Sequence, residues 1–272
     1  MPRPPKLAPV PRGRAPRLGD ADATLRPRPD KDDLEKRLAA LAPRIADLTE
    51  ALYAERRRAL LIVLQGRDAS GKDGVARRVL GSVHPQGLAI TAFGAPTDLE
   101  RRHDFLWRVH HAVPASGMVG VFNRSHYEDV LVQRVRSWVP PAVWRARYDQ
   151  INEFERSLTL NGVTVLKFML HVSREEQRTR FLERLNEPLK NWKFREGDLD
   201  DRALWPEYTR AYRDAIRKCN TPWAPWFVVP SDHKLVRDYL IARTIAETLE
   251  RMDPEYPLAS DELKRRCKKE LS

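Results

Sequence analysis

The sequence predicts an α/β fold, a parallel β-sheet with helices on both faces. Short, largely apolar runs recur along the chain at residues 59–64, 88–93, 118–122, 163–170 and 226–229. Wholly apolar runs that are rich in branched residues, such as residues 59–64, are typical of parallel strands covered on both faces. Segments with helical periodicity separate these runs, and strands that alternate with helices indicate a parallel sheet.

Helices are expected around and between the strands. The first covers residues 32–58, where apolar residues recur at helical spacing and lead into the first strand. The same criterion places further helices at residues 75–83, 99–111, 142–161, 174–186, 203–219 and 235–252. Ser173, with Glu176 three residues later, forms a capping-box pattern that places the start of the helix at residue 174.

The 272 residues are enough for one large domain with its own core. Residues 1–19 hold six prolines and five basic residues without an acidic one, a composition that cannot bury apolar surface. We therefore expect a Pro/Arg-rich arm at residues 1–29, a single domain at residues 30–258 and a basic tail at residues 259–272.

The composition is strongly basic, with 49 Lys and Arg against 38 Asp and Glu and a net charge of +11. Such a surplus indicates an acidic partner: nucleic acid, anionic lipid or a polyanionic small substrate. No apolar run approaches the ~20 residues that span a bilayer, and the N-terminus lacks the apolar segment of a secretory signal. Cys219 and Cys267 show no metal-ligand spacing and are expected as reduced thiols, so we expect a cytoplasmic protein without a membrane partner.

Residues 66–74, GRDASGKDG, match the phosphate-binding pattern G-x-x-x-x-G-K between a predicted strand and a predicted helix. Glycines let the backbone turn tightly and bring its N–H groups against phosphate oxygens. The helix that follows presents its positive dipole end to the same anion, and Lys72 adds a full charge that follows a transferred phosphoryl group. The predicted phosphate-binding residues of this loop are Gly66, Ala69, Gly71, Asp73 and Gly74.

Two carboxylates distinguish this loop from that of an ordinary ATPase. Asp73 stands where Ser or Thr usually holds magnesium, and Asp68 lies inside the cradle, where it would repel a bound triphosphate. A carboxylate at that place can bind Mg²⁺, or hold and deprotonate an attacking phosphate oxygen.

A second group of polar residues follows the strand at residues 118–122. Ligands of such sheets bind beyond the carboxyl ends of the strands, so Asn123 and Arg124 should face the P-loop. Arg124 can clamp a phosphoryl group with its planar guanidinium. Glu128 and Asp129 offer carboxylates to a metal or nucleotide, although acids at a helix N-terminus also simply favour its dipole.

A third segment, residues 186–198, carries Lys190, Lys193 and Arg195 together with two aromatic residues between two predicted helices. A basic loop in this place is a candidate lid that closes over phosphates and excludes water. Taken alone, it would more readily be interpreted as a solvated surface.

Together the segments resemble the second family of polyphosphate kinases over about residues 30–252. The resemblance rests on GRDASGKDG (66–74), HDFLWRVH (103–110), VFNRSHYEDVLV (121–132), PLKNWKF (188–194) and TPWAPWFVVPSDHK (221–234). It implies a P-loop kinase-like sheet with a helical lid at about residues 187–206. It also implies phosphoryl transfer between inorganic polyphosphate and a nucleotide, with Mg²⁺ as cofactor and Mn²⁺ as its alternative.

The resemblance also implies roles for single residues. Asp68 would orient the acceptor phosphate and help to hold the metal, while Lys72 and Arg124 would grip the transferred group. The lid would close through Lys190 and Lys193, and Arg77 and Arg78 could line a channel for the polyphosphate chain. The nucleotide-binding residues would be Asn123, Glu128 and Asp129.

The stretch N-R-S-x-Y-E-D resembles the class of this family that phosphorylates both AMP and ADP. Adenine nucleotides are therefore expected, with guanine nucleotides as a second choice, and the resemblance implies a homo-oligomer. Asn191 stands where some members carry an arginine, so the flanking lysines are expected to provide the phosphate contacts of the lid.

Two alternatives stay open at this point. An ATP-dependent nucleoside monophosphate kinase would share the loop and the lid, but Asp68 and Asp73 count against it. A nucleic-acid-binding P-loop protein would use the basic arm and the basic tail, which includes Lys264, Arg265, Arg266, Lys268 and Lys269. Its stacking surfaces would come from tryptophans, yet Trp107, Trp138 and Trp144 lie at apolar helical positions that favour core packing.

Overall fold

The computed structural model describes residues 4–271, so residues 1–3 of the expected arm and residue 272 of the tail lie outside the described residues. Its centre is one parallel sheet in the order β2-β3-β1-β4-β5. The strands are β1 (Ala59–Gln65), β2 (Leu88–Ala92), β3 (Val119–Asn123), β4 (Val163–His171) and β5 (Trp226–Pro230). Each begins and ends within one residue of its predicted limits, and the predicted α/β fold is confirmed.

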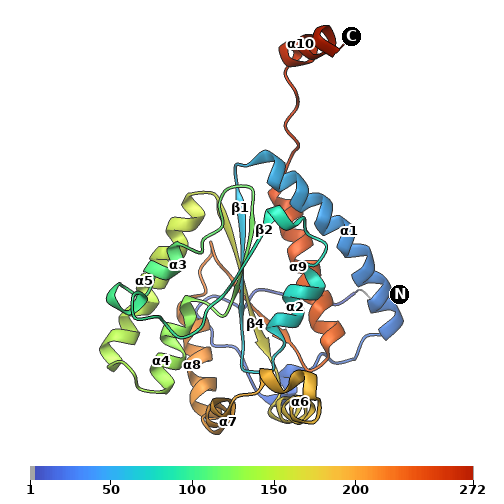
Figure 1. Ribbon diagram of the computed structural model, residues 1–272. Coiled ribbons are helices and arrows are strands. Elements are labelled where there is room, and N and C mark those ends of the chain that lie inside the picture. The colour runs from blue at the N-terminus through green and yellow to red at the C-terminus, as the bar shows by residue number, and fades with distance from the viewer. Residues whose placement is uncertain (1–3, 272) are drawn as a thin grey trace.

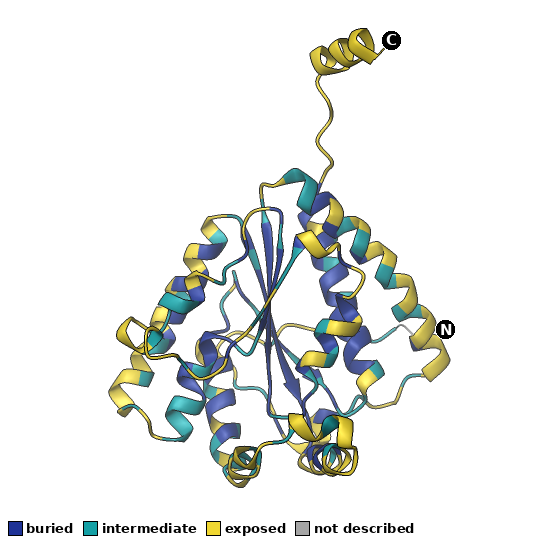
Figure 2. Ribbon diagram, in the orientation of Figure 1, coloured by how far each residue is buried: buried dark blue, intermediate teal, exposed yellow. Residues whose placement is uncertain are grey.

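Helices cover the two faces of the sheet (Figure 1). One face carries α1 (Lys31–Glu55), α2 (Lys72–Val79) and α9 (Lys234–Met252), and the other carries α5 (Pro141–Leu160) and α8 (Trp205–Lys218). Side chains of β1 alternate between the two layers: Ile62 packs under α1 and α9, and Val63 packs under α5 and α8. Burial of each such branched side chain is worth roughly 1.5–3 kcal/mol, which favours this arrangement. All seven residues of β1 are buried (Figure 2).

The chain places the carboxyl ends of β1 and β3 side by side. After β1 it builds β2 and β3 on one side of that strand and then β4 and β5 on the other, so the strand order reverses at β1. Ligands of open α/β sheets bind at such a reversal, beyond the strand ends. Two helices, α6 (Arg174–Asn186) and α7 (Glu196–Ala203), lie at this end of the molecule, toward which the β4 arrow points in Figure 1.

The lid segment is helical, as the resemblance implies. Residues 187–206 form η5 (Pro188–Lys193), α7 and the first turn of α8. Its approach helix, α6, begins as predicted, because Ser173 Oγ accepts the N–H of Glu176 at 3.2 Å. The reciprocal half of the capping box is missing, since the N–H of Ser173 donates to Asp232 Oδ1 (2.8 Å) instead.

The predicted helix at residues 99–111 is wrong as a continuous element. The segment folds as η3 (Glu100–Arg102) and α3 (Trp107–His110) with a turn between them. Asp104 Oδ1 accepts the N–H of Leu106 (2.9 Å), and this local side-chain bond competes with a helical ladder. Trp138 is also not a core residue: it lies in the turn between α4 (Val132–Val135) and α5, and 61% of it is exposed.

The two ends of the chain behave differently. The N-terminal arm, which includes η1 (Asp20–Ala23), lies on the domain: Val10 N donates to Trp226 O (2.8 Å), and Asn220 Nδ2 donates to Val10 O (2.6 Å). At the other end, α10 (Asp261–Leu271) projects from the body on the side opposite α6 and α7, and its described residues are exposed (Figures 1 and 2). Within residues 4–271, no helix is both long and apolar enough to cross a membrane.

Candidate active site

The P-loop joins β1 to α2 through a tight turn at residues 66–71. Gly66 and Gly71 have positive φ angles of 155° and 101°, and a Cβ atom at Gly71 would lie 1.9 Å from Arg237 Nη1. Ala69 also has a positive φ, 60°, and Ser70 N closes the loop by donating to Arg67 O (3.1 Å). Glycine is therefore required at residue 71 both by its backbone conformation and by the close approach of a neighbour.

Lys72 is the first residue of α2 and is buried in the loop. Its Nζ donates to Gly66 O (2.7 Å) and to Arg67 O (3.2 Å). Burial removes the ammonium group from water and, with repulsion from Arg124, lowers the pKa of Lys72 to about 8. Gly74 lies in the same first turn of α2. Asp73 is exposed and accepts Asn123 Nδ2 (2.6 Å), which links the loop to the end of β3.

Arg124 reaches the P-loop from the end of β3, as predicted. Its backbone has a φ of 62°, and its Nη2 lies 2.6 Å from Asp68 Oδ1. Burial opposes the charge of this guanidinium, but Glu128 and Asp68 outweigh burial and raise the pKa of Arg124. The acid–base pair Asp68–Arg124 thus stands beside the cradle, with 42% of the Arg124 side chain still exposed.

Glu128 completes a group of four charges that we name the cradle cluster: Asp68, Lys72, Arg124 and Glu128. Burial raises the pKa of Glu128, while Arg124 and Lys72 act in the opposite direction. Gln65, the last residue of β1, lies against Ser125 and can donate to Glu128 Oε1 at 3.0 Å. The cluster therefore holds two cations and two carboxylates at the reversal point of the sheet.

Asp129 does not belong to this cluster, although it is adjacent in sequence. Its carboxylate accepts Arg147 Nη1 at 3.3 Å, and Arg108 Nη2 lies 4.0 Å away. Burial raises the pKa of Asp129 to about 6, against the effect of the two arginines. The structure thus joins Asp129 to α3 and α5 rather than to the P-loop.

A second charged group lies behind η4 (His126–Val130), the segment that carries Glu128. We name it the core charge cluster: His126, Tyr127, Glu155 and Lys167. Lys167 Nζ contacts Glu155 Oε2 (2.5 Å), Tyr127 Oη (2.9 Å) and Cys219 O (2.7 Å). Glu155 Oε1 accepts the Tyr127 hydroxyl at 2.8 Å and lies 3.3 Å from His126 Nε2. At most 1% of each residue is exposed, so this cluster anchors η4 from inside the core.

The remaining basic candidates lie outside the cradle cluster. Arg77 is exposed on α2, and Arg78 pairs with Asp238 of α9 at 2.5 Å. In the lid, Lys190 pairs with Glu187 at 2.7 Å, and Lys193 Nζ lies 5.0 Å from the centroid of the Trp192 ring. Both lysines therefore contact their own segment.

Asn191 has a structural role in the lid. Its Nδ2 donates to Arg184 O (2.7 Å) and Leu185 O (2.9 Å), so it satisfies carbonyl groups in the last turn of α6.

Sequence reasoning gave no role to two residues near the site, Arg184 and Asp198. They lie 3.7 Å apart, one on α6 and one on α7. Burial and the nearby Asp68 both raise the pKa of Asp198, so the carboxylate of the lid lies within electrostatic reach of the cradle. The sequence signal was weak, since Arg184 is one of several charged residues on a predicted helix and Asp198 lies in a segment that can be interpreted as solvated surface.

Comparison with known proteins agrees with this geometry. The family model described as Polyphosphate kinase 2 matches residues 28–257. An AMP/ADP-polyphosphate phosphotransferase of Meiothermus ruber is 51% identical over 220 residues, which cover 81% of this chain and 82% of the relative. An ADP-polyphosphate phosphotransferase of Rhodopseudomonas palustris is 41% identical over 239 residues, covering 84% and 83% of the two chains.

A solved structure supports the same assignment. The crystal structure of Polyphosphate Kinase 2 from Arthrobacter aurescens superimposes with a TM-score of 0.85 at 42% identity, over 89% of this chain and 88% of that one. The extent of the match, the parallel sheet and the P-loop with its paired Arg124 lead to one conclusion: the chain belongs to the polyphosphate kinase 2 family.

Proposed function

We propose that the chain transfers a phosphoryl group from inorganic polyphosphate to AMP and ADP, giving ADP and ATP in a reversible reaction. The observation that carries the proposal is the meeting of Lys72, Arg124 and Asp68 at the P-loop. The names of the relatives from Meiothermus and Rhodopseudomonas support the choice of donor and acceptor.

In this proposal the two cations hold the group that moves. Lys72 and Arg124 grip the terminal phosphoryl group of the chain, where charge is spread over its oxygens during transfer. Asp68 orients the phosphate of the acceptor nucleotide. A new P–O bond forms from the acceptor oxygen to the terminal phosphorus, and the bond to the chain breaks, which leaves the polyphosphate one phosphate shorter.

The cradle carboxylates fit a hard divalent cation. Asp68 is the proposed ligand, and Glu128 supplies a second carboxylate nearby; Mg²⁺ prefers such oxygen ligands and keeps several waters. Among residues 4–271 there is no cluster of three or more His, Cys, Asp or Glu arranged as a metal site, so phosphate oxygens and water would complete the shell. When bound, Mg²⁺, or Mn²⁺ in its place, would neutralise charge on the phosphates.

The nucleotide side of the proposal rests on Asn123 and Glu128. Asn123 forms a hydrogen bond with Asp73 of the loop. Arg124 and Lys72 lie close enough to Glu128 to act against the rise in its pKa that burial causes. Asp129, in its contacts with Arg108 and Arg147, supports these nucleotide-binding residues. Arg77, Arg78, Lys190 and Lys193 remain the proposed contacts of the polyphosphate chain, and the homo-oligomer and the preference for adenine over guanine remain predictions.

The decisive experiment supplies AMP, Mg²⁺ and long-chain polyphosphate without any nucleoside triphosphate. We expect ADP and then ATP, resolved by anion-exchange chromatography. The matched reaction replaces polyphosphate by ATP as donor. If AMP is phosphorylated only when ATP is the donor, the proposal is contradicted and a nucleoside monophosphate kinase is favoured. A gel shift with DNA at moderate salt would favour nucleic-acid binding.

A further inference from the structure

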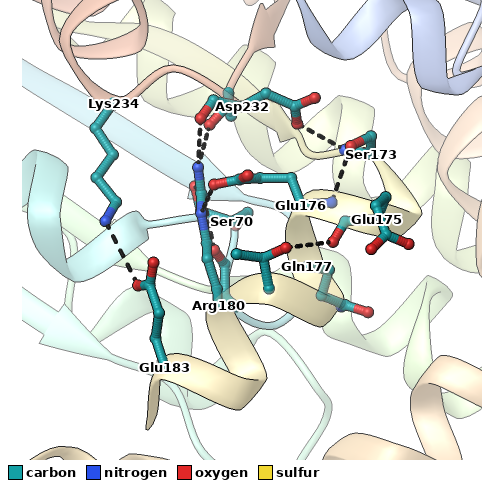
Figure 3. Close-up of polar contacts among 12 residues, drawn as sticks. Ser70, Ser173, Glu175, Glu176, Gln177, Arg180, Glu183, Asp232 and Lys234 are labelled. Carbon is teal, nitrogen blue, oxygen red and sulfur yellow. Dashed lines mark hydrogen bonds and ion pairs between the residues drawn. The ribbon is translucent and has the colours of Figure 1, made fainter. Parts of the chain in front are cut away.

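Three consecutive carbonyl groups of the P-loop are held from outside the loop by buried side chains. Gln177 Nε2 donates to Asp68 O (3.0 Å). Arg180 Nη1 donates to Ala69 O (2.8 Å) and Ser70 O (3.3 Å), and Arg237 Nη1 also donates to Ser70 O (3.1 Å). Gln177 and Arg180 are three residues apart on α6, and therefore lie on the same face of that helix (Figure 3).

All three nitrogens of the Arg180 guanidinium group donate hydrogen bonds. Only 5% of the residue is exposed. Its Nη2 donates to Ser231 O (2.7 Å) and Asp232 O (2.9 Å), and its Nε donates to Glu176 Oε1 (2.8 Å). Figure 3 shows Arg180 between Ser70, Asp232 and Glu176. The residue thus joins the P-loop to the turn that follows β5, and every nitrogen of the group has an acceptor.

Fixing the carbonyls fixes the amides of the same peptide planes. In a trans peptide the C=O of one residue and the N–H of the next point in opposite directions. Because the carbonyls of Asp68 and Ser70 point toward α6 and α9, the N–H groups of Ala69 and Gly71 point away from those helices. Backbone N–H groups of neighbouring loop residues can line an anion-binding concavity on that side.

The same helix face is also connected to the lid. Gln177 Oε1 accepts Arg202 Nη1 (2.9 Å), and Arg202 belongs to α7. Arg202 Nη1 additionally donates to Arg174 O (2.7 Å), at the start of α6. Gln177 therefore contacts the loop through its amide nitrogen and the lid through its amide oxygen.

We propose that Arg180 is a positioning residue for phosphoryl transfer, with Gln177 as its partner. Arg180 acts through the loop backbone: it holds the carbonyl side of the cradle so that the amide side is preorganised for the phosphate chain before the chain arrives. This inference rests on the proposed function, and it assigns the preorganisation of the cradle to the helix that carries the lid.

The test compares Arg180→Gln and Gln177→Leu with Arg178→Gln, a control on the same helix. Arg178 is exposed and pairs with Glu175 at 3.1 Å. We expect kcat/KM for polyphosphate to fall about 100-fold in Arg180→Gln, because small misplacements of binding groups have effects of this size. In Gln177→Leu it should fall about tenfold, because this variant loses one bond to the loop and one to Arg202 of the lid. The KM for AMP should change less than about twofold in both, because Asn123 and Glu128 lie on β3 and η4 and the Asp68 side chain is held by Arg124. Arg178→Gln should match the wild type.

A binding measurement separates positioning from folding. Isothermal titration of tripolyphosphate, without nucleotide, should show affinity at least about tenfold weaker in Arg180→Gln, with partial recovery in Arg180→Lys, which keeps the charge and a donor. A purely structural role predicts instead a fall in unfolding free energy with equal increases in both KM values. If Arg180→Gln does not fold, the same titration of Gln177→Leu decides.

The two proposals fail in different ways. Unchanged tripolyphosphate affinity in a folded Arg180→Gln or Gln177→Leu protein would overturn the positioning role while polyphosphate-dependent turnover by the wild type stands. If the wild type phosphorylates AMP only when ATP is the donor, the proposed function is overturned. Weaker tripolyphosphate binding by the variants would still support the positioning role.

Discussion

The cradle cluster and the core charge cluster both include residues of one short segment, η4. They contain similar residue types but have different roles. Lys167 places its ammonium against three acceptors, Glu155, Tyr127 and Cys219 O. Within residues 4–271, Lys72 contacts two carbonyl oxygens, which leaves its third ammonium proton to a ligand. A buried lysine whose donors are all used stabilises the fold, whereas one with a donor to spare is suited to binding.

The pKa directions follow the same division. In the core charge cluster burial opposes the charge of Glu155, yet Lys167 and His126 outweigh it and lower the pKa of Glu155. For Lys72 and Glu128 of the cradle cluster burial prevails, so that the pKa of Lys72 is lowered and that of Glu128 is raised, whereas Arg124 keeps its charge through Glu128 and Asp68. Charges that the chain leaves under-compensated are those that an incoming phosphate and its cation can stabilise.

The largest expected effect comes from breaking the core charge cluster. Lys167→Met leaves Glu155 as an uncompensated buried charge and should lower the free energy of unfolding by about 3–5 kcal/mol. Urea denaturation followed by circular dichroism measures this change. The control is the double variant Lys167→Met/Glu155→Gln, which removes both charges and should be less destabilised than the single one. A double variant that is less stable than Lys167→Met would contradict our account of the cluster.

The cradle cluster should respond in the opposite manner to the loss of its lysine. Lys72→Met should reduce kcat/KM for polyphosphate by about 10²–10³-fold, the usual effect of removing a preorganised donor. Its unfolding free energy should not fall, because the ammonium is unfavourably buried in the folded protein. Steady-state kinetics and urea denaturation of the same preparation give both values. Activity within about tenfold of the wild type would remove Lys72 from its proposed role.

The pH dependence gives the smallest and most specific effect. Because the pKa of Lys72 is lowered to about 8, its charge in the unliganded protein is lost above that pH. Since kcat/KM reports groups of the free enzyme, it should fall about tenfold per pH unit above pH 8. Rates measured from pH 6.5 to 9.5 test this, and Lys72→Arg should lack the descending limb, because a guanidinium keeps its proton.

The unfolding free energy should rise over the pH range in which kcat/KM falls. The unfolded chain keeps the Lys72 proton up to its ordinary pKa of 10.5, whereas the folded protein releases it near pH 8. Since the unfolded state binds more protons between these values, this residue makes the unfolding free energy rise with pH there. If kcat/KM of Lys72→Arg falls above the same pH as that of the wild type, another group is responsible for the fall.

Local sequence patterns were sufficient for the sheet and for the P-loop. Buried parallel strands are continuous apolar runs, and the loop glycines follow one of them directly, so both signals lie within a few residues. The approach of Arg124 to the P-loop could also be predicted, because strand ends in a parallel sheet meet at one edge.

The missing parts depend on contacts between distant residues. Nothing near Asp129 in the sequence indicates that Arg108 and Arg147 enclose it, and nothing near Arg180 indicates its contact with Ser70, 110 residues away. The break at residues 99–111 arose from one side chain, Asp104, that outweighs an otherwise helical pattern. Trp138 had a helical apolar position in the sequence, but the chain turns at Ser137, with a φ of 55°, and leaves the indole outside.

The N-terminal arm has a consequence for the solution behaviour of the protein. β5 is the last strand of the sheet, and its outer side would offer an unpaired row of backbone groups to another chain. Val10 binds the backbone of Trp226 there, and the arm continues to α9, where Arg243 Nη1 donates to Pro4 O and Pro5 O. Because prolines lack the N–H needed to extend a sheet, the arm occupies the start of this edge without offering a full new one, and we expect it to disfavour edge-to-edge pairing with another chain.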